Sequence, residues 1–225
     1  MRKLISATVL ALSLIATQAF AIPELQLYIP GASYVDGDDT WVISSNTFEL
    51  WVIGNAEKGP ISGVYLAAAY TTGESGEIKI TPTGGSTPLA TAFSGGDGTK
   101  PLLGDGSDLT PHAPWGAGTS WYSYLLGDFT SSADTIYDYT PGISGQGYGQ
   151  INKYDVDITG YASGLHFDAY DHYESGNHSN YKYIFAPNSH DAENGANPVP
   201  EPGTVVLLGA GLLSLAIYGK RRRNS

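Results

Sequence analysis

Carboxylate side chains gather on two glycine-containing turns, and they are the first residues whose types and spacing could do chemistry. Asp36, Asp38 and Asp39 form one group, and Asp105 and Asp108 form the other. Ca²⁺ binds about six to eight oxygen atoms, and tight turns bring such oxygens together. Neither group has the EF-hand spacing, so a solvated turn without an ion is the alternative. These five aspartates are therefore candidate Ca²⁺ ligands.

Histidine and carboxylate side chains also concentrate in the last third of the chain, which holds four of the five histidines. His166 and Asp168 are two residues apart, so on a strand they would share one face. A transition metal would accept imidazole and carboxylate ligands, but no spacing here matches an established zinc motif. The interpretation that the sequence favours is a hydrogen-bonded network of polar loop residues, with a metal site as the alternative. The residues concerned are His166, Asp168, Asp171, His172, Glu174, His178, His190 and Asp191.

Aromatic side chains could stack on sugar rings, although in a β-domain most of them pack in the core or across strands. Trp115 is the candidate exception, because the prolines and glycines around it predict a position near the surface. The chain has no cysteine and no G-x-S-x-G sequence, so neither a thiol nucleophile nor a nucleophile elbow is available. We predict that the protein is not an enzyme, and we name no catalytic residue.

The sequence pattern predicts that the segments that position these side chains are β-strands. Residues 154–158 alternate apolar and polar side chains, and residues 24–29, 48–53, 64–70, 77–80, 165–168 and 181–185 form further short strand-like runs. Residues 81–118 are rich in glycine, proline and aspartate and are predicted to form long loops. The pattern predicts an all-β fold: a single jelly-roll-like β-sandwich of about eight to ten strands within residues 22–187.

The charge of the body excludes one class of partner. Residues 22–202 contain five lysines and all 22 acidic residues, a formal charge of about −17. Such a surface repels nucleic acid, so we expect no nucleic-acid partner. Because cysteine is absent, disulfides cannot stabilise the fold.

The N-terminal residues 1–21 have the layout of a secretory signal peptide. Arg2 and Lys3 precede an apolar run, and Ala19 and Ala21 form a small-x-small cleavage site. The run is short for a membrane span. We predict a helical signal peptide, cleavage by signal peptidase after Ala21, and export of the body.

The C-terminal residues 199–225 form a second targeting segment, joined to the body by a polar linker at 188–198. Pro200, Glu201 and Pro202 precede an uncharged apolar stretch at 203–218, which is predicted to be a transmembrane helix. Positive charges stay on the cytoplasmic side, so the body is placed outside. A glycosylphosphatidylinositol signal does not normally end in a basic cluster, whereas a plain single-span anchor is a competing interpretation. The cluster that closes the chain includes Arg221, Arg222 and Arg223.

This arrangement resembles the PEP-CTERM sorting signal of Gram-negative bacteria. The resemblance implies that an exosortase cuts near the Pro-Glu-Pro motif and that the protein, transiently anchored in the inner membrane, then reaches the cell surface or extracellular matrix.

The body resembles the choice-of-anchor N proteins, which are exported domains without an assigned activity. The similar segments are 25–32, 50–55, 118–122, 126–129 and 166–170. The resemblance implies surface attachment. Because no sharply defined site appears in the sequence, we favour a structural or matrix-associated surface protein displayed with exopolysaccharide. The alternative is a Ca²⁺-assisted carbohydrate-binding module.

Overall fold

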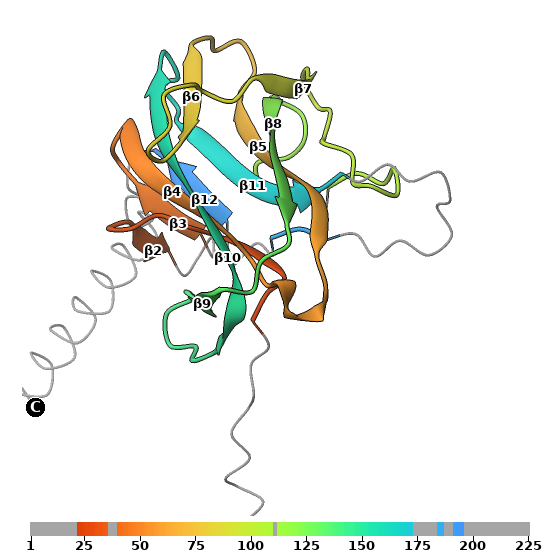
Figure 1. Cartoon of the computed structure of the whole chain (residues 1–225). Helices are drawn as coiled ribbons and strands as arrows, with labels where there is room; N and C mark the ends of the chain where they lie inside the picture. Colours follow the sequence, from red (N-terminus) through yellow and green to blue (C-terminus); the bar gives the residue numbers. More distant parts are fainter. Residues whose placement is uncertain (1–21, 36–39, 110–111, 173–183, 187–190, 196–225) are drawn as a thin grey trace, which may run out of the picture.

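A computed structural model describes residues 22–35, 40–109, 112–172, 184–186 and 191–195 of the chain. It confirms the all-β prediction, because twelve strands in this part of the chain form two sheets in a sandwich-like arrangement (Figure 1). The only helical element among these residues is one 3₁₀ turn, Ala56–Lys58. The predicted signal peptide at 1–21 and the predicted transmembrane helix at 203–218 lie outside the described residues.

The first sheet has five strands and is antiparallel throughout. Its order is β1-β4-β10-β6, and β9 pairs with the start of the long strand β10. The strands are β1 (Leu25–Tyr28), β4 (Thr47–Gly54), β6 (Glu77–Pro82), β9 (Asp134–Tyr137) and β10 (Gln146–Thr159).

The second sheet has seven strands in the order β2-β3-β12-β11-β5-β8-β7. All neighbours are antiparallel except β12 and β3, which pair in parallel. The strands are β2 (Ser33–Val35), β3 (Thr40–Ile43), β5 (Ile61–Thr71), β7 (Thr91–Gly95), β8 (Thr119–Phe129), β11 (Leu165–Asp171) and β12 (Asp191–Asn194).

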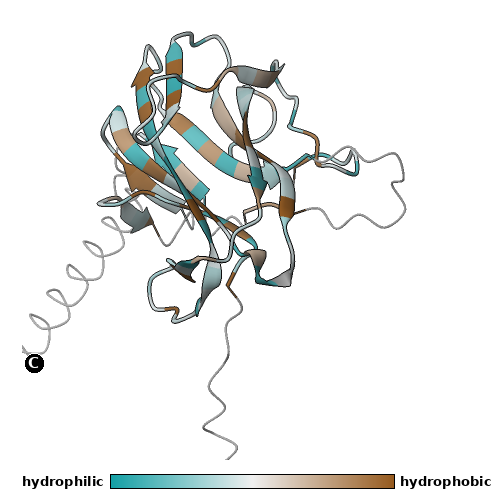
Figure 2. Ribbon diagram, in the orientation of Figure 1, coloured by the Kyte–Doolittle hydropathy of each residue, from teal (hydrophilic) through white to brown (hydrophobic). Residues whose placement is uncertain are grey.

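The main core lies between the two sheets and follows from the two-residue period of the strands. Val156 and Ile158 of β10 face Phe167 and Ala169 of β11 in one buried cluster. Figure 2 shows this alternation as brown and teal stripes along the strands. The alternate side chains of β11 must therefore point to the other face of the seven-stranded sheet.

That outer face carries a second buried cluster, covered by residues 96–109 and 112–118, which we call the covering segment. Small side chains on β5, Ala67 and Ala69, leave room above the sheet for Leu103, Leu109 and Trp115 of the segment. The covering explains why every residue of β11 is buried, although only half of them face the main core. It also creates a dry layer in which polar side chains of β11 must find partners.

The structure corrects three details of the sequence interpretation. The linker predicted at 188–198 contains β12, which pairs with β3 and β11, so the body extends beyond residue 187 to at least Asn194. The loops predicted at 81–118 contain the edge strand β7. The described residues also form more than the predicted eight to ten strands, because several are only three or four residues long.

Across the part of the chain that the structure describes, no helix has the length and apolar character needed to cross a bilayer.

Candidate metal centre

Two neighbouring strands place four polar side chains on the outer face of the seven-stranded sheet. His166 and Asp168 share this face of β11 because they are two residues apart. The register pairs His166 with Glu193 of β12, and the same register brings Asp191 beside Asp168. His166, Asp168 and Asp191 are buried because the covering segment lies over this face of the sheet.

The covering segment supplies His112, which joins His166, Asp168 and Asp191 as the fourth candidate ligand. The β5 residues opposite His166 and Asp168 are Ala69 and Ala67, and their small side chains leave space for an imidazole over the strand. One ligand atom from each of His112, His166, Asp168 and Asp191 lies within 4.8 Å of all the others.

The spacing of these atoms matches that of ligands around one ion. His112 Nε2 lies 3.2 Å from Asp168 Oδ1 and 3.3 Å from Asp191 Oδ2. His166 Nε2 lies 3.2 Å from Asp168 Oδ2 and 3.8 Å from Asp191 Oδ2. Tetrahedral zinc with bonds of about 2.0–2.2 Å holds neighbouring ligand atoms about 3.3–3.6 Å apart. The three distances that involve Asp168 Oδ1 or Asp191 Oδ2 bracket this value.

Several of these atoms are buried and make no hydrogen bond. They are His166 Nε2, Asp168 Oδ1 and both carboxylate oxygens of Asp191. Buried polar atoms normally have a partner, and leaving a charged one without any is costly. Their short mutual distances do not have hydrogen-bond geometry, which is the arrangement expected when all the atoms point at a common cation.

Two further side chains orient the candidate ligands. Glu193 Oε1 lies 2.8 Å from Nδ1 of His166, which turns the Nε2 atom of that ring towards the cluster. Trp115 donates its indole N–H to Asp168 Oδ2 at 2.6 Å and leaves Oδ1 for an ion. In metal sites, a histidine ligand usually hydrogen-bonds to a carboxylate through its other ring nitrogen, and a carboxylate ligand usually accepts a hydrogen bond from a neighbouring donor.

Without a cation, the buried charges of His166, Asp168 and Asp191 are balanced only through shifted protonation. Burial disfavours the charged form of His166, but Asp168, Glu193 and Asp191 outweigh it and raise the pKa of His166 to about 10. Burial also opposes ionisation of Asp168, yet the two imidazoles, His166 above all, hold its pKa well below the usual range. Burial and the adjacent Asp168 raise the pKa of Asp191 well above its usual value. A divalent cation would balance both carboxylates and leave both imidazoles neutral.

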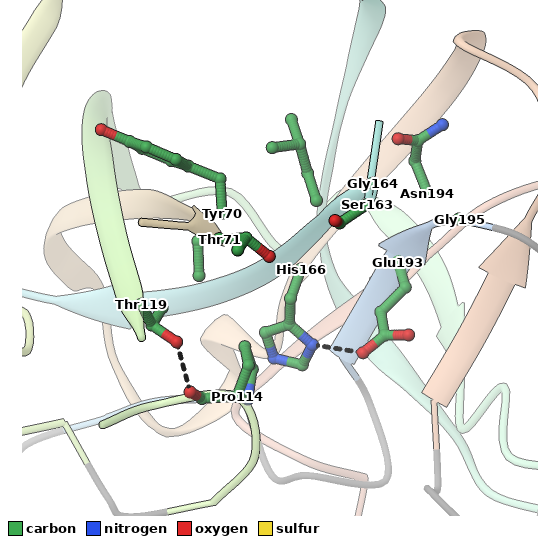
Figure 3. Close-up of a pocket in the computed structure, with 12 residues that line it drawn as sticks. Tyr70, Thr71, Pro114, Thr119, Ser163, Gly164, His166, Glu193, Asn194 and Gly195 are labelled. Carbon is green, nitrogen blue, oxygen red and sulfur yellow. Dashed lines mark hydrogen bonds and ion pairs between the residues drawn. The ribbon is translucent and has the colours of Figure 1, made fainter. Parts of the chain in front are cut away.

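The four side chains are closed off from solvent. The side chains of His112 and His166 are 7% and 5% exposed, and those of Asp168 and Asp191 are each 1% exposed. A pocket of about 290 Å³ reaches the cluster from one side only at His166 and Glu193 (Figure 3). The Glu193 side chain is 37% exposed, so it lies between the buried cluster and the solvent.

The aspartates predicted to bind Ca²⁺ are not part of this cluster. Asp105 Oδ1 accepts hydrogen bonds from the backbone N–H and the hydroxyl of Ser107, so it closes its own turn. Asp108 is exposed on the same turn. Asp36, Asp38 and Asp39 lie outside the described residues.

Trp115 does not have the predicted position near the surface. Its side chain is 8% exposed and packs in the second buried cluster, with its N–H donated to Asp168. The expectation failed because the proline and glycine residues around Trp115 let the segment fold inward over the sheet. A ring in this position is not available to stack on a sugar.

The sequence indicates His166, Asp168 and Asp191 as alternative metal ligands, but it does not indicate His112. His112 lies far from the other three in the chain, and only the fold of the covering segment brings it to them. The strand pair His166-x-Asp168 was the usable signal, since it puts an imidazole and a carboxylate on one face.

Comparison with known proteins identifies the C-terminal segment. Residues 198–223 match the PEP-CTERM protein-sorting motif, which confirms the predicted signal around Pro200, Glu201 and Pro202 and the basic end with Arg221, Arg222 and Arg223. Neither the curated proteins nor the solved structures give a significant match. The match does not extend to the body, so its resemblance to the choice-of-anchor N proteins stays a prediction. The motif implies an exported surface protein that is anchored in the membrane and processed by an exosortase.

Proposed function

We propose that the protein is a structural surface protein, displayed with exopolysaccharide after exosortase processing, whose body is held together by one buried transition-metal ion. The observation that carries the metal part is the convergence of four buried ligand atoms from His112, His166, Asp168 and Asp191. The matched sorting motif supports the surface part.

Zinc fits the ligand set better than Ca²⁺ or Mg²⁺. Two imidazole nitrogens are poor ligands for those hard cations, which prefer oxygen. Imidazole and carboxylate together suit zinc, and zinc accepts four protein ligands in a tetrahedron. The spacing of the candidate ligand atoms His112 Nε2, His166 Nε2, Asp168 Oδ1 and Asp191 Oδ2 agrees with that geometry.

A structural role is favoured over a catalytic one by the closure of the site. Catalytic zinc usually has three protein ligands and an open position for water, whereas structural zinc has four protein ligands. This cluster offers four, all largely excluded from solvent. The proposal is therefore a protein without enzymatic activity.

The ion would connect three segments that are far apart in the chain. His112 comes from the covering segment, His166 and Asp168 come from β11, and Asp191 comes from the short strand β12. The chain has no cysteine, so no disulfide can make such a connection. Metal binding to the folded state adds directly to the stability of the fold.

The alternative of a Ca²⁺-assisted carbohydrate-binding module is less favoured at two of the residues first named, whereas Asp36, Asp38 and Asp39 lie outside the described residues. Asp105 is engaged in its own turn, and Trp115 is buried behind the metal cluster.

Metal analysis of the purified full-length protein in detergent tests the proposal. We expect about one zinc ion per chain, and a loss of that zinc in Asp168→Asn and in His166→Gln. Asp157→Asn and His172→Gln are matched controls, because both residues lie outside the cluster, and they should retain the metal.

Chelation gives an independent measurement. At a metal concentration about a thousandfold above Kd, binding contributes about 4 kcal/mol, which corresponds to about 8–16 °C in Tm for a chain of this size. A protein that is isolated without a transition metal, and whose Tm neither zinc nor a chelator changes, would contradict the proposed metal centre.

A further inference from the structure

A second pocket, of about 550 Å³, lies apart from the metal cluster on the same side of the seven-stranded sheet. Strands β7, β8 and β11 form its floor, and the chain after β7 forms its wall. Its lining includes Phe93, Thr99, Lys100, Leu102, Trp121 and Tyr170. The volume is in the range of small-molecule sites, about 300–1,000 Å³.

Aromatic and aliphatic side chains give the pocket an apolar floor and rim. Trp121 and Tyr170 are buried at 7% and 1% exposure, whereas Phe93 and Leu102 are 40% and 46% exposed. Tyr65 holds the rings in place, since its ring centroid lies 5.3 Å from that of Phe93 and 5.8 Å from that of Tyr170. The exposed face of Phe93 thus belongs to an ordered stack of rings.

Hydrogen bonds fix the wall of the pocket against its floor. The Trp121 indole N–H donates to the Thr99 hydroxyl at 3.1 Å, and that hydroxyl donates to the Gly96 carbonyl at 2.7 Å. Gly95 permits this approach, because a Cβ atom there would lie 2.2 Å from Trp121 Nε1. The pocket is therefore built into the fold by contacts between distant parts of the chain.

Lys100 gives the pocket a positive charge that no acidic group neutralises within the described part of the chain. The residue is half-buried. Two other lysines have partners: Lys79 pairs with Glu77 at 2.9 Å, and the Lys153 ammonium lies 4.1 Å from the centre of the Trp51 ring. A half-buried lysine without a counter-charge, in a body of about −17, favours an anionic group in the pocket.

We infer that this pocket binds an acidic saccharide, with a uronic acid unit whose ring face packs on Phe93 and whose carboxylate pairs with Lys100. Such a sugar combines a flat apolar face, several hydroxyl groups and a single negative charge. The pocket offers the complement of each: aromatic rings, the hydroxyl groups of Ser94 and Thr99, and one ammonium. The inference goes beyond the proposed function, because none of these residues belongs to the metal cluster.

Calorimetry of the purified, metal-loaded full-length protein with trigalacturonic acid tests the inference. Its methyl ester is the matched ligand, because esterification removes the charge and keeps the ring. We expect the acid to bind at least about tenfold more tightly than the ester, the loss that follows removal of a hydrogen bond to a charged group.

Two variants locate the binding. Lys100→Gln should abolish the preference for the acid over the ester, and Phe93→Ala should weaken both ligands. Lys79→Gln and Tyr148→Ala are controls, since both residues are exposed and neither lines this pocket. All four variants should retain their metal, so failure of the metal centre would be recognised separately. Absence of binding, equal affinity for acid and ester, or unchanged affinity in Lys100→Gln and Phe93→Ala would overturn the inference.

Discussion

Trp115→Phe measures how much the buried donor contributes to the metal centre. In the folded protein the Trp115 indole N–H donates to Asp168 Oδ2 at 2.6 Å, and both side chains are buried. Phenylalanine keeps an aromatic ring in the cluster but removes the donor. A carboxylate oxygen then stays buried without its hydrogen bond.

The magnitude follows from comparison with a second tryptophan of similar burial. Trp121 is 7% exposed and Trp115 is 8% exposed, but Trp121 donates to the neutral hydroxyl of Thr99. Losing a hydrogen bond to a charged group costs about 1.5–3 kcal/mol, and losing a neutral one costs about 0.5–1.5 kcal/mol. The ring truncation is the same in both variants, so its contribution approximately cancels in the comparison.

We therefore expect Trp115→Phe to be less stable than Trp121→Phe by about 1–2 kcal/mol, or about 2–8 °C in Tm. Thermal unfolding followed by circular dichroism measures this difference. Metal affinity, measured by competition with a chromophoric chelator, should fall about 10–100-fold in Trp115→Phe and stay unchanged in Trp121→Phe. Equal Tm values together with an unchanged metal affinity in Trp115→Phe would refute the role assigned to the indole.

Three further predictions follow from other parts of the chain. Burial raises the pKa of Asp171 to about 6, despite the Ile184 N–H that it accepts at 2.9 Å, so its neutral form is favoured on folding. The stabilisation from the neutral Asp171 carboxyl is therefore complete below about pH 4 and is lost as the pH rises through about 6. Asp171→Asn should remove about 1–3 kcal/mol of this pH dependence in the free energy of unfolding. Parallel pH profiles of urea unfolding for the wild type and Asp171→Asn would contradict the prediction. Gly164 has φ +82°, and a Cβ atom there would lie 1.8 Å from the Asn194 carbonyl oxygen, so Gly164→Ala should displace β12 and increase hydrogen exchange at residues 191–195. Gly73→Ala is the control, because Gly73 also has a positive φ (+94°) but no atom would lie within 4 Å of its Cβ. For sorting, mass spectrometry of surface material should find a C-terminus near Pro202, whereas recovery of only the full-length chain from the inner membrane would favour a simple anchor.

Local patterns in the sequence were sufficient for six of the twelve strands in the described part of the chain and for the C-terminal signal. The six strands are β1, β4, β5, β6, β10 and β11. The alternation around Tyr154 and Ile158 predicted the centre of β10, because one face of a half-buried strand must be apolar. The two-residue spacing of His166 and Asp168 likewise predicted that they share a face of β11. The sorting motif was readable because its three parts lie next to one another in the chain.

Contacts between distant segments were decided only by the tertiary structure. Nothing near Asp191 in the sequence indicates a strand, and β12 exists because β3 and β11 provide partners on both sides. Trp115 and His112 lie in a segment with the composition of a surface loop, yet the segment folds over the small side chains of Ala67 and Ala69.

The physical reason is that strand periodicity specifies which face a side chain occupies but not which strand or segment lies opposite. The sequence by itself determined the all-β class, the C-terminal sorting signal, and the shared face of His166 and Asp168. The tertiary structure alone decided that His112 and Asp191 meet that face. Burial then removed water from the four side chains and left their atoms pointing at one another, which is the arrangement that a metal ion would satisfy.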